Sequence, residues 1–195
     1  MLEPVARAVT GAATQLQNLE SSDAPDLAKT IARKLVDSLS DKPRPTPAEL
    51  PASVQTLALG DAQPESAEVG WLKPASNRVP INQYVPSPLL DSGKLYATGL
   101  YAHAPSHYIF NLGGKWKELT GQAGLHTLHQ PYGTVVFIIR ADGRQLFRSP
   151  VIRGASKATY KLDIRGVRQL ELVVDPTEDG NHNDWALWLD PVLSR

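Results

Sequence analysis

The pattern of apolar and polar residues divides the chain into a helical start, a proline-rich middle and a long strand-forming remainder. Within residues 1–42, apolar side chains recur at steps of three and four, which places them on one face of a helix. Capping residues ahead of a proline interrupt this pattern at residues 21–25. The pattern therefore predicts a helical hairpin. The two apolar faces comprise Val5, Val9, Ala12, Leu16 and Leu19, and Leu27, Ile31, Leu35, Val36 and Leu39.

Residues 43–70 are rich in proline and poor in large apolar side chains. Each proline removes a backbone donor and restricts φ, which penalises both a helix and a central strand. Spaced prolines favour extended, semi-rigid conformations. We favour a linker that holds one module away from another. An ordered strap that runs over the next domain is the alternative.

Residues 71–195 contain short runs of β-forming residues separated by turn signals. Asp142-Gly143 lies between two of these runs and predicts a hairpin. Repeated short strands without a long helical stretch are typical of an antiparallel sandwich. The fold class is therefore mainly β, with a sandwich over 71–195 preceded by the helical hairpin and the linker. The strand-like runs are 108–112, 135–139, 145–148, 158–164 and 169–174.

Composition narrows the function classes. The 195 residues contain 20 Lys and Arg and 20 Asp and Glu, with a mild excess of positive charge only after residue 70. This excess is too dilute for a nucleic-acid interface. The absence of cysteine excludes disulfides, thiolate nucleophiles and cysteine-based zinc sites. No apolar run approaches the ~20 residues of a membrane helix, and no secretory signal is visible, so the localisation stays open.

Several motifs, in order and spacing, resemble the NPCBM/NEW2 domain, a carbohydrate-binding module related to carbohydrate-binding module family 51. The resemblance covers about residues 71–193 and implies a jelly-roll-type β-sandwich. Such domains are attached to glycoside hydrolases and other extracellular proteins, and some bind galactose-containing glycans. The matching motifs are Gly99–Ala104, Tyr108–Trp116, Val136–Ser149, Leu170–Asp175 and Asp184–Asp190.

The last motif departs from the family pattern. Asp184, Trp188 and Asp190 match it, whereas Trp185 replaces a histidine and Leu187 replaces an aspartate. These changes lie near the site that the resemblance implies, so they bear on the ligand more than on the fold.

Sugar recognition requires an aromatic surface for the C–H face of the ring and a few polar groups for its hydroxyls. The aromatic candidates are Trp71, Tyr101, Trp185 and Trp188, and the polar candidates are His103, Arg153, Asn181, His182, Asn183 and Asp184. Of the two neighbouring tryptophans, we expect Trp188 in the core and Trp185 as the stacking platform. His103 has two interpretations, a hydroxyl contact or a structural histidine between loops. The residues predicted to bind the ligand are Tyr101, His103, Asn183, Asp184 and Trp185.

The sequence supports a metal site or a catalytic site less well than it supports a sugar-binding site. The pairs His103/His107 and His126/His129 have a ligand spacing that suits helices, but both lie in predicted strands or loops. Asp179, Asn181 and Asp190 are candidate calcium ligands, although the positions of an EF-hand glycine and glutamate are not matched and an Asx-rich turn is favoured. No nucleophile motif of the Gly-x-Ser-x-Gly type is present.

The sequence thus favours a non-catalytic module that binds a glycan weakly and directs an attached glycoside hydrolase or other catalytic domain. A structural or protein-interaction sandwich without a sugar ligand is the alternative. A fragment of a longer enzyme is a third hypothesis.

Overall fold

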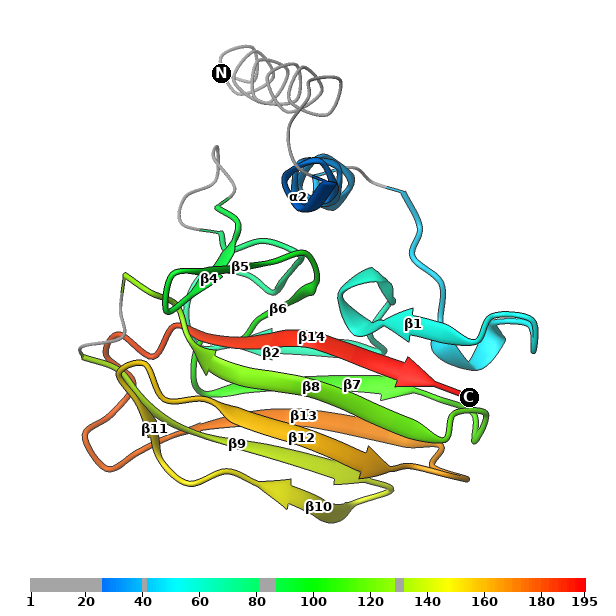
Figure 1. Cartoon of the computed structure of the whole chain (residues 1–195). Coiled ribbons are helices and arrows are strands. Elements are labelled where there is room, and N and C mark those ends of the chain that lie inside the picture. Colours follow the sequence, from blue (N-terminus) through cyan, green and yellow to red (C-terminus); the bar gives the residue numbers. More distant parts are fainter. Residues whose placement is uncertain (1–25, 40–41, 81–86, 129–131) are drawn as a thin grey trace, which may run out of the picture.

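The computed structural model describes residues 26–39, 42–80, 87–128 and 132–195. Within them, two antiparallel sheets pack face to face (Figure 1). Sheet A has the strand order β12 (Ala158–Asp163), β8 (Glu118–Leu125), β14 (Ala186–Ser194), β6 (Gly99–Tyr101) and β3 (Ala75–Ser76), and β1 (Thr56–Ala58) also pairs with β14. Sheet B has the order β10 (Arg144–Arg148), β9 (Thr134–Ala141), β13 (Gln169–Pro176), β7 (Ser106–Asn111) and β2 (Ser66–Val69), and β11 (Ile152–Arg153) also pairs with β9. The hairpin of β4 (Leu89–Asp91) and β5 (Lys94–Tyr96) lies outside both sheets.

Apolar side chains from both sheets fill the interior, because alternate residues of each strand point toward the facing sheet. Trp188 of β14 has no exposed surface, and its ring packs edge-on against Phe137 of β9 with a centroid distance of 4.9 Å. The expectation that Trp188 lies in the core is met. The mainly β, antiparallel sandwich predicted from the sequence is confirmed.

The five strand-like runs of the sequence correspond to β7, β9, β10, β12 and β13. Asp142 and Gly143 both have positive φ and connect β9 to β10, as their turn preference predicts. The long central strand β8 had no clear alternation, partly because it contains Gly121. A Cβ at Gly121 would lie 2.3 Å from the hydroxyl oxygen of Tyr160 on β12, so the glycine makes room for that ring.

Residues 43–70 need a correction, because much of this segment belongs to the sandwich. β1 pairs with β14, and β2 forms the edge of sheet B against β7. Between them, the 3-10 turn η2 (Leu59–Asp61) places Leu59 fully inside the core. A second 3-10 turn, η1 (Pro47–Glu49), accepts a hydrogen bond from the indole of Trp116 through the carbonyl of Pro47. The ordered strap describes this segment better than a linker, since β1 and β2 supply edge pairing that the prolines do not block.

One helix precedes the sheets in the described residues, α2 (Asp26–Ser38). It buries Ile31 and Leu35 of the predicted apolar face together with Ala32, whereas the first helix of the expected hairpin lies outside the described residues. No helix in the described ranges is long and apolar enough to cross a membrane.

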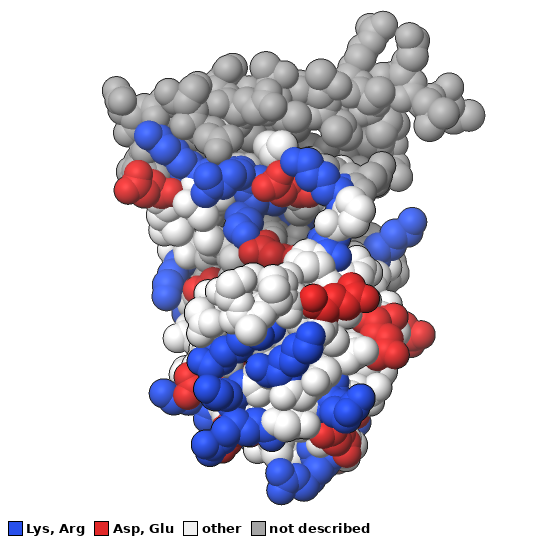
Figure 2. All heavy atoms as spheres, turned by 90° about the vertical axis from the view of Figure 1, so that its right-hand side faces the viewer, with Lys and Arg blue, Asp and Glu red and all other residues white. Residues whose placement is uncertain are grey.

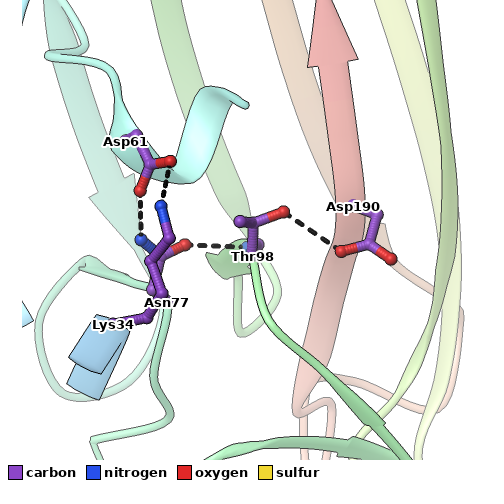
Figure 3. Close-up of polar contacts among 6 residues, drawn as sticks. Lys34, Asp61, Asn77, Thr98 and Asp190 are labelled. Carbon is purple, nitrogen blue, oxygen red and sulfur yellow. Dashed lines mark hydrogen bonds and ion pairs between the residues drawn. The ribbon is translucent and has the colours of Figure 1, made fainter. Parts of the chain in front are cut away.

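A polar network connects α2 to sheet A (Figure 3). Lys34 of α2 forms an ion pair with one carboxylate oxygen of Asp61, and the side-chain amide of Asn77 donates to the other at 2.7 Å. The side-chain oxygen of Asn77 in turn accepts the backbone N–H of Gly99 on β6 at 3.0 Å. Polar side chains that form an ion pair and hydrogen bonds with one another thus anchor the helix to the sandwich.

Charges of both signs are interspersed on the face at the right of Figure 1. Figure 2 shows Lys and Arg side chains alternating there with Asp and Glu. Lys161 on β12 and Glu118 on β8 form an ion pair of 3.2 Å at the protein surface. Pairs of this kind add little to the free energy of unfolding.

Candidate functional site

A pocket of about 370 Å³ opens at one end of the sandwich. Three segments meet there: the chain leaving β2, the connection from β6 to β7, and the loop from β13 to β14. Each of the three segments directly follows or precedes a strand, so the sheets fix the positions of the ends of these segments. The pocket is lined by Gly70, Trp71, His103, Asn181, His182, Asn183 and Trp185.

Two tryptophans form the apolar part of this lining. Trp71 is 59% exposed, and its backbone carbonyl accepts a hydrogen bond of 3.2 Å from the hydroxyl of Tyr101. Trp185 is half-buried, and its ring makes edge contacts with Tyr101 at 5.5 Å and His103 at 6.0 Å between centroids. The rings of Tyr101 and His103 therefore pack against Trp185 and fix the orientation of its ring.

The loop before β14 turns sharply to present its polar side chains. Asn183 has a φ of 65°, a left-handed conformation that asparagine tolerates better than most residues. The carbonyl of Asn183 accepts the backbone N–H of Trp185 at 2.8 Å. This tight turn places the side chain of Trp185 beside those of Asn181 and Asn183 in the pocket.

Close approach of two backbones forms the opposite wall. The backbone N–H of Gly70 donates to the carbonyl of His103 at 3.0 Å. A Cβ at Gly70 would lie 2.2 Å from the carbonyl oxygen of Ala104, so this approach requires glycine. The ring Nδ1 of His103 lies 2.9 Å from the carbonyl oxygen of Ala104, and the residue is almost fully buried.

Asp184 connects the loop between β13 and β14 to the sandwich. Its Oδ1 accepts the backbone N–H of Thr134 at 2.9 Å, while its Oδ2 is buried and has no hydrogen-bond partner in the described part of the chain. Burial raises the pKa of Asp184 to about 6, although the hydrogen bond from Thr134 acts in the opposite direction. Asp184 thus supports the pocket and does not line it.

Comparison with protein families decides the identity of the fold. Residues 55–194 match the NPCBM/NEW2 domain. The chain belongs to the NPCBM/NEW2 family. The match begins at residue 55, so it includes β1 and β2, which the sequence had placed before the domain.

Individual relatives agree with this assignment. A protein of Renibacterium salmoninarum named as a candidate endo-alpha-N-acetylgalactosaminidase is 31% identical over 102 residues, which are 52% of this chain and 7% of that protein. Among solved structures, the second CBM51 domain with the INT domains of Clostridium perfringens ZmpB superposes with a TM-score of 0.65 at 23% identity, covering 72% of this chain and 32% of that one. The CBM51 domain of Clostridium perfringens GH95, in complex with methyl-galactose, gives a TM-score of 0.64 at 20% identity, covering 71% of this chain and 99% of that one. At these identities the structural neighbours establish the fold.

The NPCBM domain brings three of the five predicted binding residues to the pocket. His103, Asn183 and Trp185 line it. Tyr101 and Asp184 do not line it, because both are almost fully buried. Tyr101 packs in a cluster with Leu89 and Tyr96 of the β4–β5 hairpin. Tyr101 instead supports Trp71 and Trp185 from the interior.

The other residues of the pocket wall were not predicted from the sequence to bind the ligand. Trp71, Asn181 and His182 were among the aromatic and polar candidates but were not selected as ligand-binding residues. Gly70 carried no signal in the sequence, because its role depends on a contact with Ala104, a residue on a different segment.

The predicted calcium ligands are not assembled by the fold. Hydroxyl groups of Thr177 and Thr134 donate to the carboxylate of Asp179 and hold its pKa below the usual range. Asp190 lies four residues beyond Ala186 on β14, roughly 13 Å along the strand, and accepts a hydrogen bond from the hydroxyl of Thr98 (Figure 3). Nor do the described ranges contain any group of three or more His, Cys, Asp or Glu suited to a metal ion. Asp179 and Asp190 thus accept hydrogen bonds from different segments of the chain, and calcium binding stays a prediction.

Proposed function

We propose that the pocket binds a neutral saccharide weakly and reversibly, and that the chain is a non-catalytic accessory module. The observation that carries this proposal is the pairing of Trp71 and Trp185 with amide and imidazole side chains in one open pocket. An indole ring offers a flat apolar face for the C–H groups of a sugar, and an asparagine amide both donates to and accepts from hydroxyl groups. The described residues of the lining include no Asp, Glu, Lys or Arg, which favours an uncharged ligand.

The accessory role rests on the relatives. The similar region of the Renibacterium salmoninarum protein is 7% of a chain named as a glycosidase. A module that holds a glycan raises the effective concentration of an attached catalytic domain near its substrate, even when its own affinity is modest. We therefore expect the protein to act with an attached or associated glycoside hydrolase or other catalytic partner.

Galactose-type sugars are the first candidates for the ligand. One structural neighbour is described with methyl-galactose and another with GlcNAc. In this chain Trp185 and Leu187 stand at positions where the family pattern has His and Asp. Leu187 is fully buried and packs with Tyr101 and Leu189. The position at which this apolar residue replaces the acidic residue of the family pattern therefore lies beneath the pocket lining. We place galactose first and GlcNAc second.

The test is an NMR titration of the full chain with methyl-galactose, GlcNAc and glucose, alongside a glycan array. We expect saturable shifts of the indole N–H resonances of Trp71 and Trp185 with at least one sugar. Trp71→Ala and Trp185→Ala should each lower the affinity about tenfold, because each removes one stacking face.

Tyr132→Ala is the matched control, since Tyr132 is an exposed aromatic residue that does not line the pocket. Its affinity should equal that of the wild type. No binding of any saccharide by a chain that gives a well-dispersed spectrum would reject the proposal and favour the protein-interaction alternative. Equal losses in all three variants would also contradict it.

A further inference from the structure

A second pocket, of about 440 Å³, differs from the first in charge. It lies between the strap at residues 42–44, the chain around residues 63–67, and the β3 segment at residues 74–78. Among the described residues, its lining includes three basic residues, Lys42, Arg44 and Arg78, and no Asp or Glu. We call it the basic pocket.

Arg78 is the least compensated charge of the basic pocket. Its Nε atom is fully buried and has no hydrogen-bond partner among the described residues. None of the ion pairs within 4.0 Å in the described ranges includes its guanidinium. Burial, together with the nearby charge of Arg44, lowers the pKa of Arg78. The Nε–H of Arg78 in this position lacks the acceptor that water or a carboxylate would otherwise provide.

Arg44 approaches the same space from the strap. Its Nη1 donates to the hydroxyl of Ser76 at 2.5 Å, which orients the guanidinium across the pocket toward β3. Lys42 contributes less, because its ammonium already pairs with Asp37 at 3.6 Å. The two arginines therefore supply most of the uncompensated charge in the basic pocket.

The nearest candidate counter-charge is already engaged. Asp61 lies in a neighbouring pocket that Arg44 also lines. Figure 3 shows its two carboxylate oxygens directed at Lys34 and Asn77, with both interactions formed. Asn77 directly precedes Arg78 and has a φ of 58°, so the same network determines where the backbone of Arg78 leaves the turn. The carboxylate of Asp61 serves this turn and does not neutralise the arginines.

We propose that the basic pocket binds the oxyanion group of an acidic ligand, a carboxylate or a sulfate, between the guanidinium groups of Arg44 and Arg78. Guanidinium groups present several donors in a planar fork that matches two oxygens of such a group, and Ser76 adds a hydroxyl. The pocket lies within the range of about 300–1,000 Å³ that is typical of ligand sites, so it has room for a sugar ring behind the charged group. Pro43, Pro64 and Pro74 offer apolar walls for that ring.

The experiment follows the Nε–Hε resonance of Arg78 in the full chain by ¹H–¹⁵N NMR. Sodium sulfate and sodium glucuronate are titrated separately, with sodium chloride at matched ionic strength as the reference. We expect a saturable shift with one or both oxyanions and none with chloride. A response to both salts would show that the oxyanion group alone suffices, and a response to glucuronate alone would show that the sugar ring contributes.

Variants locate the effect. Arg78→Lys keeps the charge but loses the planar fork, and Arg44→Gln removes the second cation, so each should lower the affinity about tenfold. Arg144→Gln, an exposed arginine on β10 outside the basic pocket, removes the same charge and should bind as the wild type does. The wild-type titration decides the matter if a variant does not fold. The absence of any oxyanion-specific shift, or an equal loss in Arg144→Gln, would overturn the proposal.

Discussion

Asp184 joins the loop between β13 and β14 to β9, and it does so with a carboxyl group that is buried. Its Oδ1 holds the N–H of Thr134, and its Oδ2 has no hydrogen-bond partner in the described residues. A carboxylate is costly in this environment, whereas the protonated acid is not. The folded protein therefore favours the neutral form of Asp184 up to about pH 6.

This predicts how stability depends on pH. Because the pKa of Asp184 is raised by folding, the folded chain keeps a proton that the unfolded chain loses above its ordinary pKa. The contribution of Asp184 to the free energy of unfolding is therefore complete below about pH 4 and is lost as the pH rises through about 6. Asp184→Asn keeps an acceptor for Thr134 and cannot ionise. We expect it to be more stable than the wild type at pH 7.5, by up to about 3 kcal/mol, and equal at pH 4.

Chemical denaturation at a series of pH values measures this difference. Glu178→Gln, an exposed residue of the same loop, is the control and should leave the pH profile unchanged. An Asp184→Asn variant with the pH slope of the wild type would exclude this role for Asp184.

At the scale of elements, the strands before residue 71 complete the sandwich. β2 covers the edge of sheet B, and β1 pairs with the C-terminal half of β14, from Val192 to Ser194. Leu59 and Ala62, between the two strands, are fully buried in the main core. The loss of a single buried leucine side chain already costs about 2–5 kcal/mol. Such a loss is a large share of the 5–15 kcal/mol that stabilises an ordinary domain.

We therefore expect a fragment of residues 71–195 not to fold. Its circular dichroism spectrum should lack a cooperative thermal transition, because sheet B loses its edge strand and the core loses Leu59. A fragment of residues 42–195, which retains β1 and β2, is the matched comparison and should unfold cooperatively. Cooperative unfolding of the shorter fragment within a few degrees of the longer one would show that β1 and β2 are dispensable.

At the scale of the whole molecule, α2 is attached to the sandwich and is not part of its core. The family match begins at residue 55, after the helix. Ile31, Ala32 and Leu35 are buried, but they belong to none of the clusters that fill and cover the sheets. The ion pair of Lys34 with Asp61 is a polar link between the helix and the sandwich.

Removal of residues 1–41 should accordingly change the melting temperature only slightly. A partly exposed ion pair contributes about 0–1 kcal/mol, which corresponds to a shift of less than about 4 °C for a domain of this size. Differential scanning calorimetry of residues 42–195 and of the full chain measures this shift. A decrease of 10 °C or more would instead make α2 an integral part of the fold.

The sequence by itself determined the strands whose pattern is local. Short runs of β-forming residues predicted β7, β9, β10, β12 and β13, and Asp142-Gly143 predicted the hairpin between β9 and β10. These signals depend on neighbouring residues, whose conformational preferences act over a few positions. Trp188 was predicted correctly as a core residue, and Trp185 was predicted as part of the pocket wall.

Only the tertiary structure decided which segments meet. β1 and β2 were hidden among prolines, because edge strands tolerate proline and depend on a distant partner for their pairing. Tyr101 was expected in the binding site, but it is buried because it packs with Leu89 and Tyr96 of the β4–β5 hairpin, which lies outside both sheets. The two pockets arise in the same way: Trp71 meets Trp185 across more than a hundred residues of chain, and Arg44 meets Arg78 across the strap. Such contacts reflect long-range packing, and no local pattern in the sequence encodes them.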